Sequence, residues 1–304
     1  MDREGNILYA IHGEENRKYV PLSEISPYLQ KATIAIEDDG FYEHSGFDIP
    51  GITKAVLYEV FGIGTRRGGS TITQQLAKNA FLSSRRAYTR KLKELILAVR
   101  LERAYDKDKI LELYLNRIPY GNNAYGAEMA AKMYFNKSAK DLTLVESVIL
   151  AGLPKAPTFY SPYGPNAYSK FELEFNANKF SKIPTTIQDL NESDYTIGLI
   201  GKNISFAPSN NLYLPGRTDI ILKRMAELEL IAEEDKQAAL REIQALQFQK
   251  YHEVMKAPHF VFYIRSLLEE QFGKDVVAQG GLRVYTTLDP KLQTVAEEAV
   301  AEQI

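Results

Sequence analysis

The chain has 304 residues, of which 45% are hydrophobic and 25% are charged, and this composition provides for one large core or two smaller ones. Its net charge of −2 creates no field that would attract a nucleic acid, and the absence of cysteine excludes disulfides and thiolate metal sites. Four histidines without an HExxH spacing do not predict a zinc site.

The ends of the chain show no recognisable membrane-targeting signal. No apolar run approaches the roughly 18 residues that cross a bilayer, and no signal peptide follows Met1. Residues 288–304 have a helical pattern that stops without a cap or a breaker. We therefore expect the chain to be a piece of a longer protein.

The first long helix is predicted to carry two acids at its end. Ser26 and Pro27 supply an N-cap and a proline at the first helical position. The helix that they open ends at Glu37 and Asp38, where carboxylates oppose the helix dipole. This placement is unfavourable unless another group compensates, and it therefore indicates a functional role.

Capping residues mark further helix starts in the predominantly helical part of the chain, residues 26–153. Asp48 is suited to cap a helix that ends near Gly62. Reciprocal capping, in which each side chain bonds the backbone of the other residue, is also predicted. The pairs are Thr71 with Gln74 and Thr143 with Glu146.

The most informative helix is predicted within residues 85–105, RRAYTRKLKELILAVRLERAY. At about 100° per residue, four apolar residues share one arc and four charged residues lie opposite. The charged side is either a solvated face with salt pairs or an anion site that includes a carboxylate. The apolar arc comprises Leu92, Leu95, Ile96 and Val99, and the charged side comprises Arg86, Arg90, Lys93 and Glu94.

The character of the sequence changes in residues 166–214, where asparagine, serine and aromatic residues become frequent and the helical period fades. We expect an insertion here, with little core of its own and a small hairpin that turns around residues 201–203. Helical periodicity resumes after residue 216, and the run GGLRVYTTLDP at 280–290 predicts a strand.

The stretch EDDGFYEHSG, residues 37–46, is a candidate site for acid–base chemistry. A general base must be ionised yet partly desolvated, and Phe41 and Tyr42 can provide an apolar wall for Glu37. His44 is suited either to orient Glu37 or to hold the loop by hydrogen bonding. The alternatives are that Glu37 is a surface acid near a turn and that His44 is structural.

The stretch RRGGSTITQQLAKN, residues 66–79, has the features of a phosphate cradle. Gly68 and Gly69 allow close backbone approach, and the following helix start exposes N–H donors. It is not a Walker A loop, because GxxxxGK[ST] is absent. The alternative is a glycine turn before a polar helix cap. The side-chain donors are Ser70, Thr71, Thr73, Gln74, Gln75 and Lys78.

Combined, these three sites predict one kind of substrate. Two carboxylates in separate motifs, Glu37 and Glu94, suit acid–base work at a sugar or phosphate centre. The glycine-rich donors and the cationic helix face suit an anion that develops during the reaction. We therefore expect a sugar hydroxyl that is deprotonated and a diphosphate that is stabilised as it leaves.

Five motifs then occur in order, and with them the sequence resembles the peptidoglycan glycosyltransferase (transglycosylase) domain of class A bifunctional penicillin-binding proteins of the 1A type. That resemblance implies a mainly α, lysozyme-like helical domain, followed by a short α+β linker fragment of the transpeptidase domain. The motifs are EDDGFYEHSG (37–46), GGSTITQQLAKN (68–79), RKLKE (90–94), KILELYLNRIPYG (109–121) and AGLPKAPTFYSP (151–162).

The resemblance also implies a division of the chain. It covers roughly residues 2–165 and resumes at about residue 216. The expected parts are an N-terminal lead-in after a membrane anchor (1–20), the glycosyltransferase domain (21–235, with 166–214 as insertion), and the linker with the truncated start of a transpeptidase domain (236–304).

The resemblance implies that the chain polymerises lipid II. Glu37 would be the general base on the 4-hydroxyl of the acceptor sugar, with inversion at the donor's anomeric carbon. Glu94 would assist at the diphosphate side, by positioning groups or by holding a divalent cation such as Mg or Mn, and no organic cofactor is expected. The implied substrate-binding residues are Lys78, Arg86, Lys93, Arg90, Ser70, Thr71, Gln74, Asn79, His44 and Asp38.

Several features depart from the family pattern. Asp39 stands where relatives often carry a basic residue. SxxK and KTG are absent, so no transpeptidase site is expected. The segment YEVFGIG, residues 58–64, lies where relatives place an apolar, membrane-dipping segment, with ordinary core packing as the alternative.

The implied partners are lipid II, the growing glycan chain, the membrane surface and other cell-wall synthesis proteins, with no nucleic acid. The implied location is the extracytoplasmic face of the bacterial inner membrane, with a single-pass anchor in the full-length protein. Two other functions are compatible with part of the pattern. A lysozyme-like lytic glycosidase would share the catalytic Glu37 but give Lys78, Arg86 and Lys93 no common purpose. A non-catalytic cell-wall or lipid-binding module would not need both Glu37 and Glu94.

Overall fold

A computed structural model shows two compact units. The larger unit is formed by Arg17–Tyr251, and the smaller by Met1–Asn16 together with His252–Ile304. The structure describes residues 1–9, 16–47, 70–81, 88–172, 184–207, 210–246, 248, 256–279 and 282–302.

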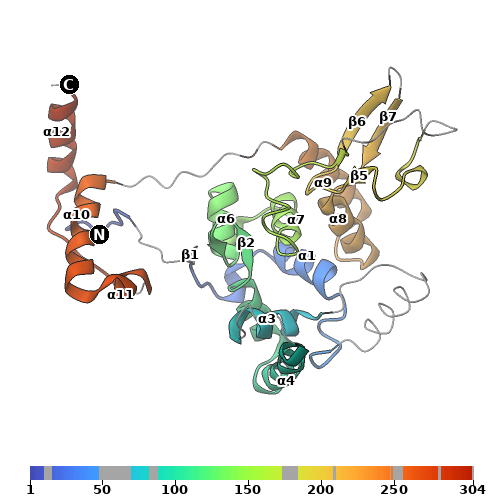
Figure 1. The fold of residues 1–304 in the computed structure, drawn as a ribbon, viewed down its shortest axis with the longest axis horizontal. Helices are drawn as coiled ribbons and strands as arrows, with labels where there is room; N and C mark the ends of the chain where they lie inside the picture. Colours follow the sequence, from blue (N-terminus) through green and yellow to red (C-terminus); the bar gives the residue numbers. More distant parts are fainter. Residues whose placement is uncertain are drawn as a thin grey trace. The chain divides into compact units, whose positions relative to one another are not determined.

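The larger unit is built mainly from helices, so the mainly α class predicted from the sequence is confirmed (Figure 1). The helix start predicted at Pro27 occurs. Its helices are α1 (Pro27–Glu37), α3 (Ile72–Phe81), α4 (Tyr88–Ala104), α5 (Lys107–Leu115), α6 (Ala127–Phe135), α7 (Leu144–Gly152), α8 (Arg217–Glu227) and α9 (Glu233–Ala245).

Helix α7 forms the centre of this unit. Its sequence, LVESVILAG, is apolar on nearly every side, and residues 145–152 are all buried, as expected for a helix that is surrounded by others. It packs against α1, α6, α8 and α9. The predicted capping pair at its start is confirmed, because Thr143 and Glu146 bond each other's backbone.

The N-cap residue of α1 has a different role from the predicted one. Ser26 occupies the N-cap position but makes no side-chain capping bond. Its hydroxyl instead donates to the carbonyl of Leu142, 2.9 Å away, just before α7. The residue therefore joins the start of α1 to the central helix.

Short strands complete the larger unit. Residues Asn16–Arg17 (β1), Ala124–Tyr125 (β3) and Pro119–Gly121 (β2) form a three-stranded sheet in that order. Two antiparallel pairs join Lys170–Phe171 (β4) to Tyr195–Thr196 (β5) and Lys202–Ala207 (β6) to Asn210–Leu214 (β7).

The turn predicted around residues 201–203 is wrong, because Lys202 and Asn203 already belong to β6 and pair with Leu214 and Tyr213. Gly201 marks a close approach instead of a turn: a Cβ atom there would lie 2.3 Å from the hydroxyl oxygen of Tyr213. The region 166–214 also contributes to the main core through Leu199 and Ile200.

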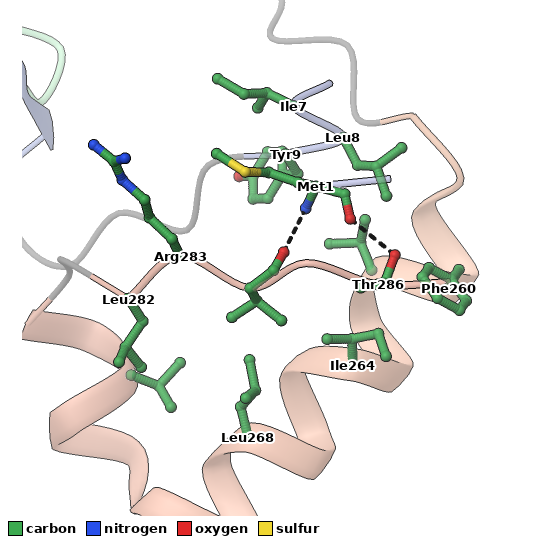
Figure 2. Close-up of a pocket in the computed structure, with 13 residues that line it drawn as sticks. Met1, Ile7, Leu8, Tyr9, Phe260, Ile264, Leu268, Leu282, Arg283 and Thr286 are labelled. Atoms are coloured by element: carbon green, nitrogen blue, oxygen red, sulfur yellow. Dashed lines mark hydrogen bonds between the residues drawn. The ribbon is translucent and has the colours of Figure 1, made fainter. Parts of the chain in front are cut away.

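The smaller unit contains α10 (Pro258–Phe272), α11 (Lys274–Gln279) and α12 (Pro290–Ala301). Where a strand was predicted, residues 282–289 form no assigned strand but bond to the N-terminus. The Met1 amine donates to Val284 O at 2.8 Å, and Thr286 Oγ1 donates to Met1 O at 2.8 Å (Figure 2). Arg3 N–H donates to Leu288 O at 3.0 Å. Apolar side chains of these segments and of α10 line a cavity of about 270 Å³.

The observed units differ from the predicted parts in two places. Helix α9, which the prediction divided at residue 236, belongs to the larger unit because Ala239 and Ile243 enter its core. The described residues 1–9 belong with the C-terminal segment. Within the described ranges, no helix has both the length and the hydropathy needed to cross a bilayer.

Candidate active site

Glu37, the last residue of α1, holds its carboxylate against two other helices. Oε1 accepts a hydrogen bond from Nη2 of Arg217 in α8, at 3.2 Å, and Oε2 accepts one from Nε2 of Gln75 in α3, at 2.9 Å. The side chains of Glu37 and Arg217 are only 14% and 7% exposed. Arg217 is therefore the compensating group that the unfavourable position of Glu37 called for.

Sequence reasoning missed Arg217, which lies 180 residues from Glu37 along the chain. The sequence did contain an indication of this partner. A cation in the first turn of a helix is disfavoured by the helix dipole, just as an anion in the last turn is. The guanidinium also donates from Nε to Gly152 O at 2.8 Å and lies 5.5 Å from the centre of the Tyr160 ring. Burial lowers the pKa of Arg217, and the charge of Glu37 acts in the opposite direction.

We call residues 37–46 the acidic turn. Asp38 and His44 hold this turn against the start of α3. A carboxylate oxygen of Asp38 accepts from the backbone N–H of Ile72 at 3.0 Å. Gly46 N–H donates to Nδ1 of His44, which assigns the ring proton to Nε2, and this atom donates to Asp38 at 2.9 Å. Both side chains thus have positioning contacts inside the protein, and their predicted substrate contacts stay a prediction.

Residues 70–79, the described part of the predicted phosphate cradle, are called the donor loop, and they fold against the same turn. Thr71 Oγ1 and Gln74 Nε2 both donate to Gly46 O, at 2.9 and 3.1 Å. Half of the predicted Thr71–Gln74 capping pair is present, since Gln74 N–H donates to Thr71 Oγ1 at 3.2 Å while the Gln74 amide turns to Gly46. These bonds fix the start of α3 beside the acidic turn.

Lys91, a residue that the sequence analysis did not select, connects this loop to the second carboxylate. Its Nζ lies 3.0 Å from Ser70 Oγ, 3.1 Å from Gln74 Oε1 and 3.2 Å from Glu94 Oε2. Glu94 is 5% exposed. The RKLKE motif placed Lys91 one helical turn before Glu94, so the (i, i+3) spacing was an available signal.

The face of α4 that is buried differs from the apolar arc predicted from the sequence. Leu92 is 61% exposed and Ile96 is 47% exposed, whereas Glu94 and Ala98 are buried. Helix α4 packs on α3 through the side that carries Glu94 and Ala98. The small Ala98 lets its backbone come close to the acidic turn: a Cβ atom on Gly46 would lie 3.5 Å from Ala98 O.

A continuous polar path joins the two predicted catalytic carboxylates. It runs from Glu37 to the Gln75 amide, which lies 3.5 Å from Ser70 O, and from the Ser70 hydroxyl through Lys91 to Glu94. Tyr114 supports it by donating to Gln75 Oε1 at 3.1 Å. The structure therefore places both carboxylates and the donor loop in one connected site.

Three more of the predicted residues have described side chains. Lys78, Asn79 and Lys93 are exposed on α3 and α4. Arg86 lies outside the described residues, and of Arg90 the structure describes only the helical backbone. The predicted helix between Asp48 and Gly62 and the segment 58–64 also lie outside the described residues.

Asp39, the departure from the family pattern, is paired with a cation. Arg224, seven residues after Arg217 on α8, contacts Asp39 Oδ2 through Nη2. Helix α8 therefore pairs a cation with Glu37 and another with Asp39.

The described part of the chain does not contain three acid or histidine side chains grouped as metal ligands. Glu94 is a single carboxylate that already accepts from Lys91. Such a group does not form a metal site alone, but it suits Mg²⁺, which is commonly held by one or two carboxylates together with substrate phosphates.

Comparison with known proteins gives consistent matches. A family model described as Transglycosylase matches residues 4–179. Penicillin-binding protein 2D of Bacillus subtilis (strain 168) is 35% identical over 317 residues, covering 99% of this chain and 39% of that protein. Penicillin-binding protein 1A of Neisseria flavescens is 35% identical over 301 residues, covering 98% of this chain and 31% of that protein.

A shorter match with higher identity is found in a third protein. Penicillin-binding protein 1F of Bacillus subtilis (strain 168) is 47% identical over 162 residues, which are 53% of this chain and 22% of that protein. The chain thus spans well under half the length of each of these relatives.

Proposed function

The chain belongs to the transglycosylase family, and on this premise we propose that it is a peptidoglycan glycosyltransferase that polymerises lipid II into β-1,4-linked glycan strands. The resemblance seen in the sequence is confirmed by the family match. The observation that carries the proposal is the polar path between Glu37 and Glu94, because it joins an acid–base side and an anion side in one site.

Glu37 acts as the general base. It takes the proton of the acceptor's 4-hydroxyl while that oxygen attacks the anomeric carbon of the donor. The bond from that carbon to the lipid diphosphate breaks, configuration inverts, and the electron pair leaves with undecaprenyl diphosphate. The bonds from Arg217 and Gln75 support this role by fixing the direction of the Glu37 carboxylate.

The departing diphosphate is stabilised by the cations and donors on α3 and α4. Lys91 is held at the site, and Lys78 and Lys93 are exposed on the same helices. Arg86 and Arg90 extend this set by family resemblance, as do the predicted contacts of Ser70, Thr71 and Asn79. Preorganised donors of this kind stabilise charge that develops in the transition state.

A divalent cation, Mg or Mn, is proposed as a companion of the diphosphate. Glu94 is the residue that would hold it, with Lys91 on the other side of the same carboxylate. When bound, the ion neutralises charge on the diphosphate oxygens.

The proposed location is the extracytoplasmic face of the inner membrane, where lipid II is available. A single-pass anchor in the full-length protein is proposed by resemblance to the class A penicillin-binding proteins. The expected partners are lipid II, the growing glycan strand, the membrane surface and other cell-wall synthesis proteins.

The test is incubation of the chain with lipid II, detergent and a divalent metal, with glycan length followed by gel electrophoresis. Long strands are expected from the wild type, and Glu37→Gln is expected to lower turnover at least about 100-fold, since general bases contribute about that much or more. Glu43→Gln is the matched control, because Glu43 is exposed in the same turn and has no assigned role.

Three results would contradict the proposal. Activity of Glu37→Gln within a few-fold of wild type would remove the base from that position. Release of soluble fragments from preformed glycan, without polymer from lipid II, would indicate a lytic glycosidase. Binding of lipid II without turnover would indicate a non-catalytic module.

A further inference from the structure

Helix α8, which carries Arg217, starts against a part of the predicted insertion. The N–H of Arg217 donates to Gly198 O at 2.9 Å, and the N–H of Thr218 donates to Leu199 O at 3.0 Å. The first N–H groups of a helix have no partner within it, so these carbonyls satisfy the start of α8. We call Ser169 together with residues 198–200 the α8 support.

Ser169 fixes the α8 support to the residues before the helix. Its hydroxyl donates to Pro215 O at 2.8 Å and accepts from Gly198 N–H at 2.9 Å. Its backbone N–H donates to Ile200 O at 2.8 Å. One buried side chain thus connects both sides of the contact on which α8 begins.

At two glycines the backbone of this contact packs directly against neighbouring backbone. A Cβ atom on Gly216 would lie 2.2 Å from Gly201 N, and one on Gly198 would lie 2.3 Å from the carbonyl carbon of Tyr168. Since real Cβ atoms do not come this close to backbone, only glycine fits at either position. The start of α8, and with it the Cα of Arg217, is therefore held in one position.

Arg217 connects the start of α8 to Glu37. Its Nε bonds Gly152 O at the end of α7, and its Nη2 bonds Glu37 Oε1. The guanidinium is planar, so these two bonds fix its plane as well as its distance from the carboxylate.

We propose that the α8 support is a positioning element for the catalytic base, and that it acts through Arg217, a positioning residue for the Glu37 carboxylate. This inference rests on the proposed function, because it assumes that Glu37 is the base. It assigns a role to a region that the sequence suggested only as an insertion.

The groups that face Glu37 determine what effect is expected when Arg217 is replaced. Arg217 faces it from α8, neutral Gln75 from α3, and the buried phenols of Tyr114 and Tyr120 from α5 and β2, with Asp38 next in the chain. Burial, and after it the charge of Glu37, raise the pKa of both phenols. These phenols stay neutral at working pH, so Arg217 supplies positive charge that favours the ionised carboxylate.

The experiment measures kcat/KM against pH for wild type, Arg217→Gln, Arg217→Lys and Ser169→Ala. Arg217→Gln removes the positive charge that faces the Glu37 carboxylate, so the acid limb of the pH profile is expected to move to higher pH in this variant. Arg217→Lys should recover part of this shift. Ser169→Ala, which leaves Arg217 in place, should move the limb in the same direction by a smaller amount.

Arg224→Gln is the matched control. It also removes a guanidinium from α8, but this guanidinium pairs with Asp39 instead of Glu37. Its acid limb is expected to move less than that of Arg217→Gln. Circular dichroism shows whether each variant is folded; if Arg217→Gln is not, Ser169→Ala and Arg217→Lys carry the test. An acid limb that stays within about 0.2 pH units of wild type in the folded variants overturns the proposal.

A second readout separates this inference from the proposed function. Carbon-13 NMR can follow the titration of the Glu37 carboxyl carbon, assigned by its loss in Glu37→Gln, without any turnover. A midpoint that rises in Arg217→Gln and Ser169→Ala supports the positioning role even if the wild type makes no polymer. An unchanged midpoint overturns it even if the wild type is an active polymerase.

Discussion

At the scale of single residues, Glu37 and Arg217 each occupy the helix end at which its charge is disfavoured. An anion at the end of α1 and a cation at the start of α8 both oppose the helix dipole. Their contact removes part of both penalties, because each charge compensates the other in a buried place. Truncating only one of them leaves the other buried without its partner, which is more costly than losing the pair.

Tyr42, in the acidic turn, provides a pH-dependent prediction. Burial, and then a hydrogen bond of 2.9 Å to Asp108, raise the pKa of its phenol to about 12. A pKa raised by folding gives stability that is complete below the unfolded value of about 10 and is lost as pH rises toward the folded value. The difference in free energy of unfolding between wild type and Tyr42→Phe should therefore be smaller at pH 11 than at pH 8.

Urea unfolding at both pH values measures this difference. An equal difference at pH 8 and pH 11 would contradict the raised pKa. Absorbance at 295 nm, compared between wild type and Tyr42→Phe, checks directly that the phenol is still protonated at pH 11.

At the scale of secondary-structure elements, helix α4 shows how a correct period can accompany a wrong orientation. The spacing grouped Leu92 with Ile96 correctly, since both share one face, but that face is exposed. The opposite side is buried because Lys91 and Glu94 bond the start of α3 and because Ala98 permits close packing. A lysine and an acid therefore decide which face of α4 packs.

The orientation of α4 can be tested with the same substitution on its two sides. Leu92→Gln should change the free energy of unfolding by no more than about 0.5 kcal/mol, as is usual on a surface. Ala98→Gln should cost about 2 kcal/mol or more, because it overpacks a full site and buries an amide. Chemical denaturation of both variants measures this, and equal costs would contradict the orientation of α4.

At the scale of the whole molecule, the two units differ in how much core they contain. Most of the buried apolar residues of the larger unit form one cluster, which extends from Val20 to Ile243. In the described part of the smaller unit the cluster consists of Leu8, Ala257, Val261 and Leu288. Large side chains on α10, such as Phe262 and Tyr263, are exposed.

This difference predicts unequal local stability. Regions with few buried apolar contacts open at lower free energy than the rest of a protein. Backbone amides of α10 should therefore exchange with deuterium well before those of α7, where every residue from 145 to 152 is buried. Hydrogen exchange followed by mass spectrometry measures both segments in one sample, and equal protection would contradict the prediction.

The sequence by itself determined the helical class, the start of α1 at Pro27, the capping of α7 and the acidic end of α1, because caps and periodicity act between residues that are neighbours in the chain. Only the tertiary structure decided which face of α4 is buried and that Arg217 is the partner of Glu37. A period assigns residues to a common face without saying what that face packs against. A contact across 180 residues depends on where α1, α7 and α8 come to lie in the packed core.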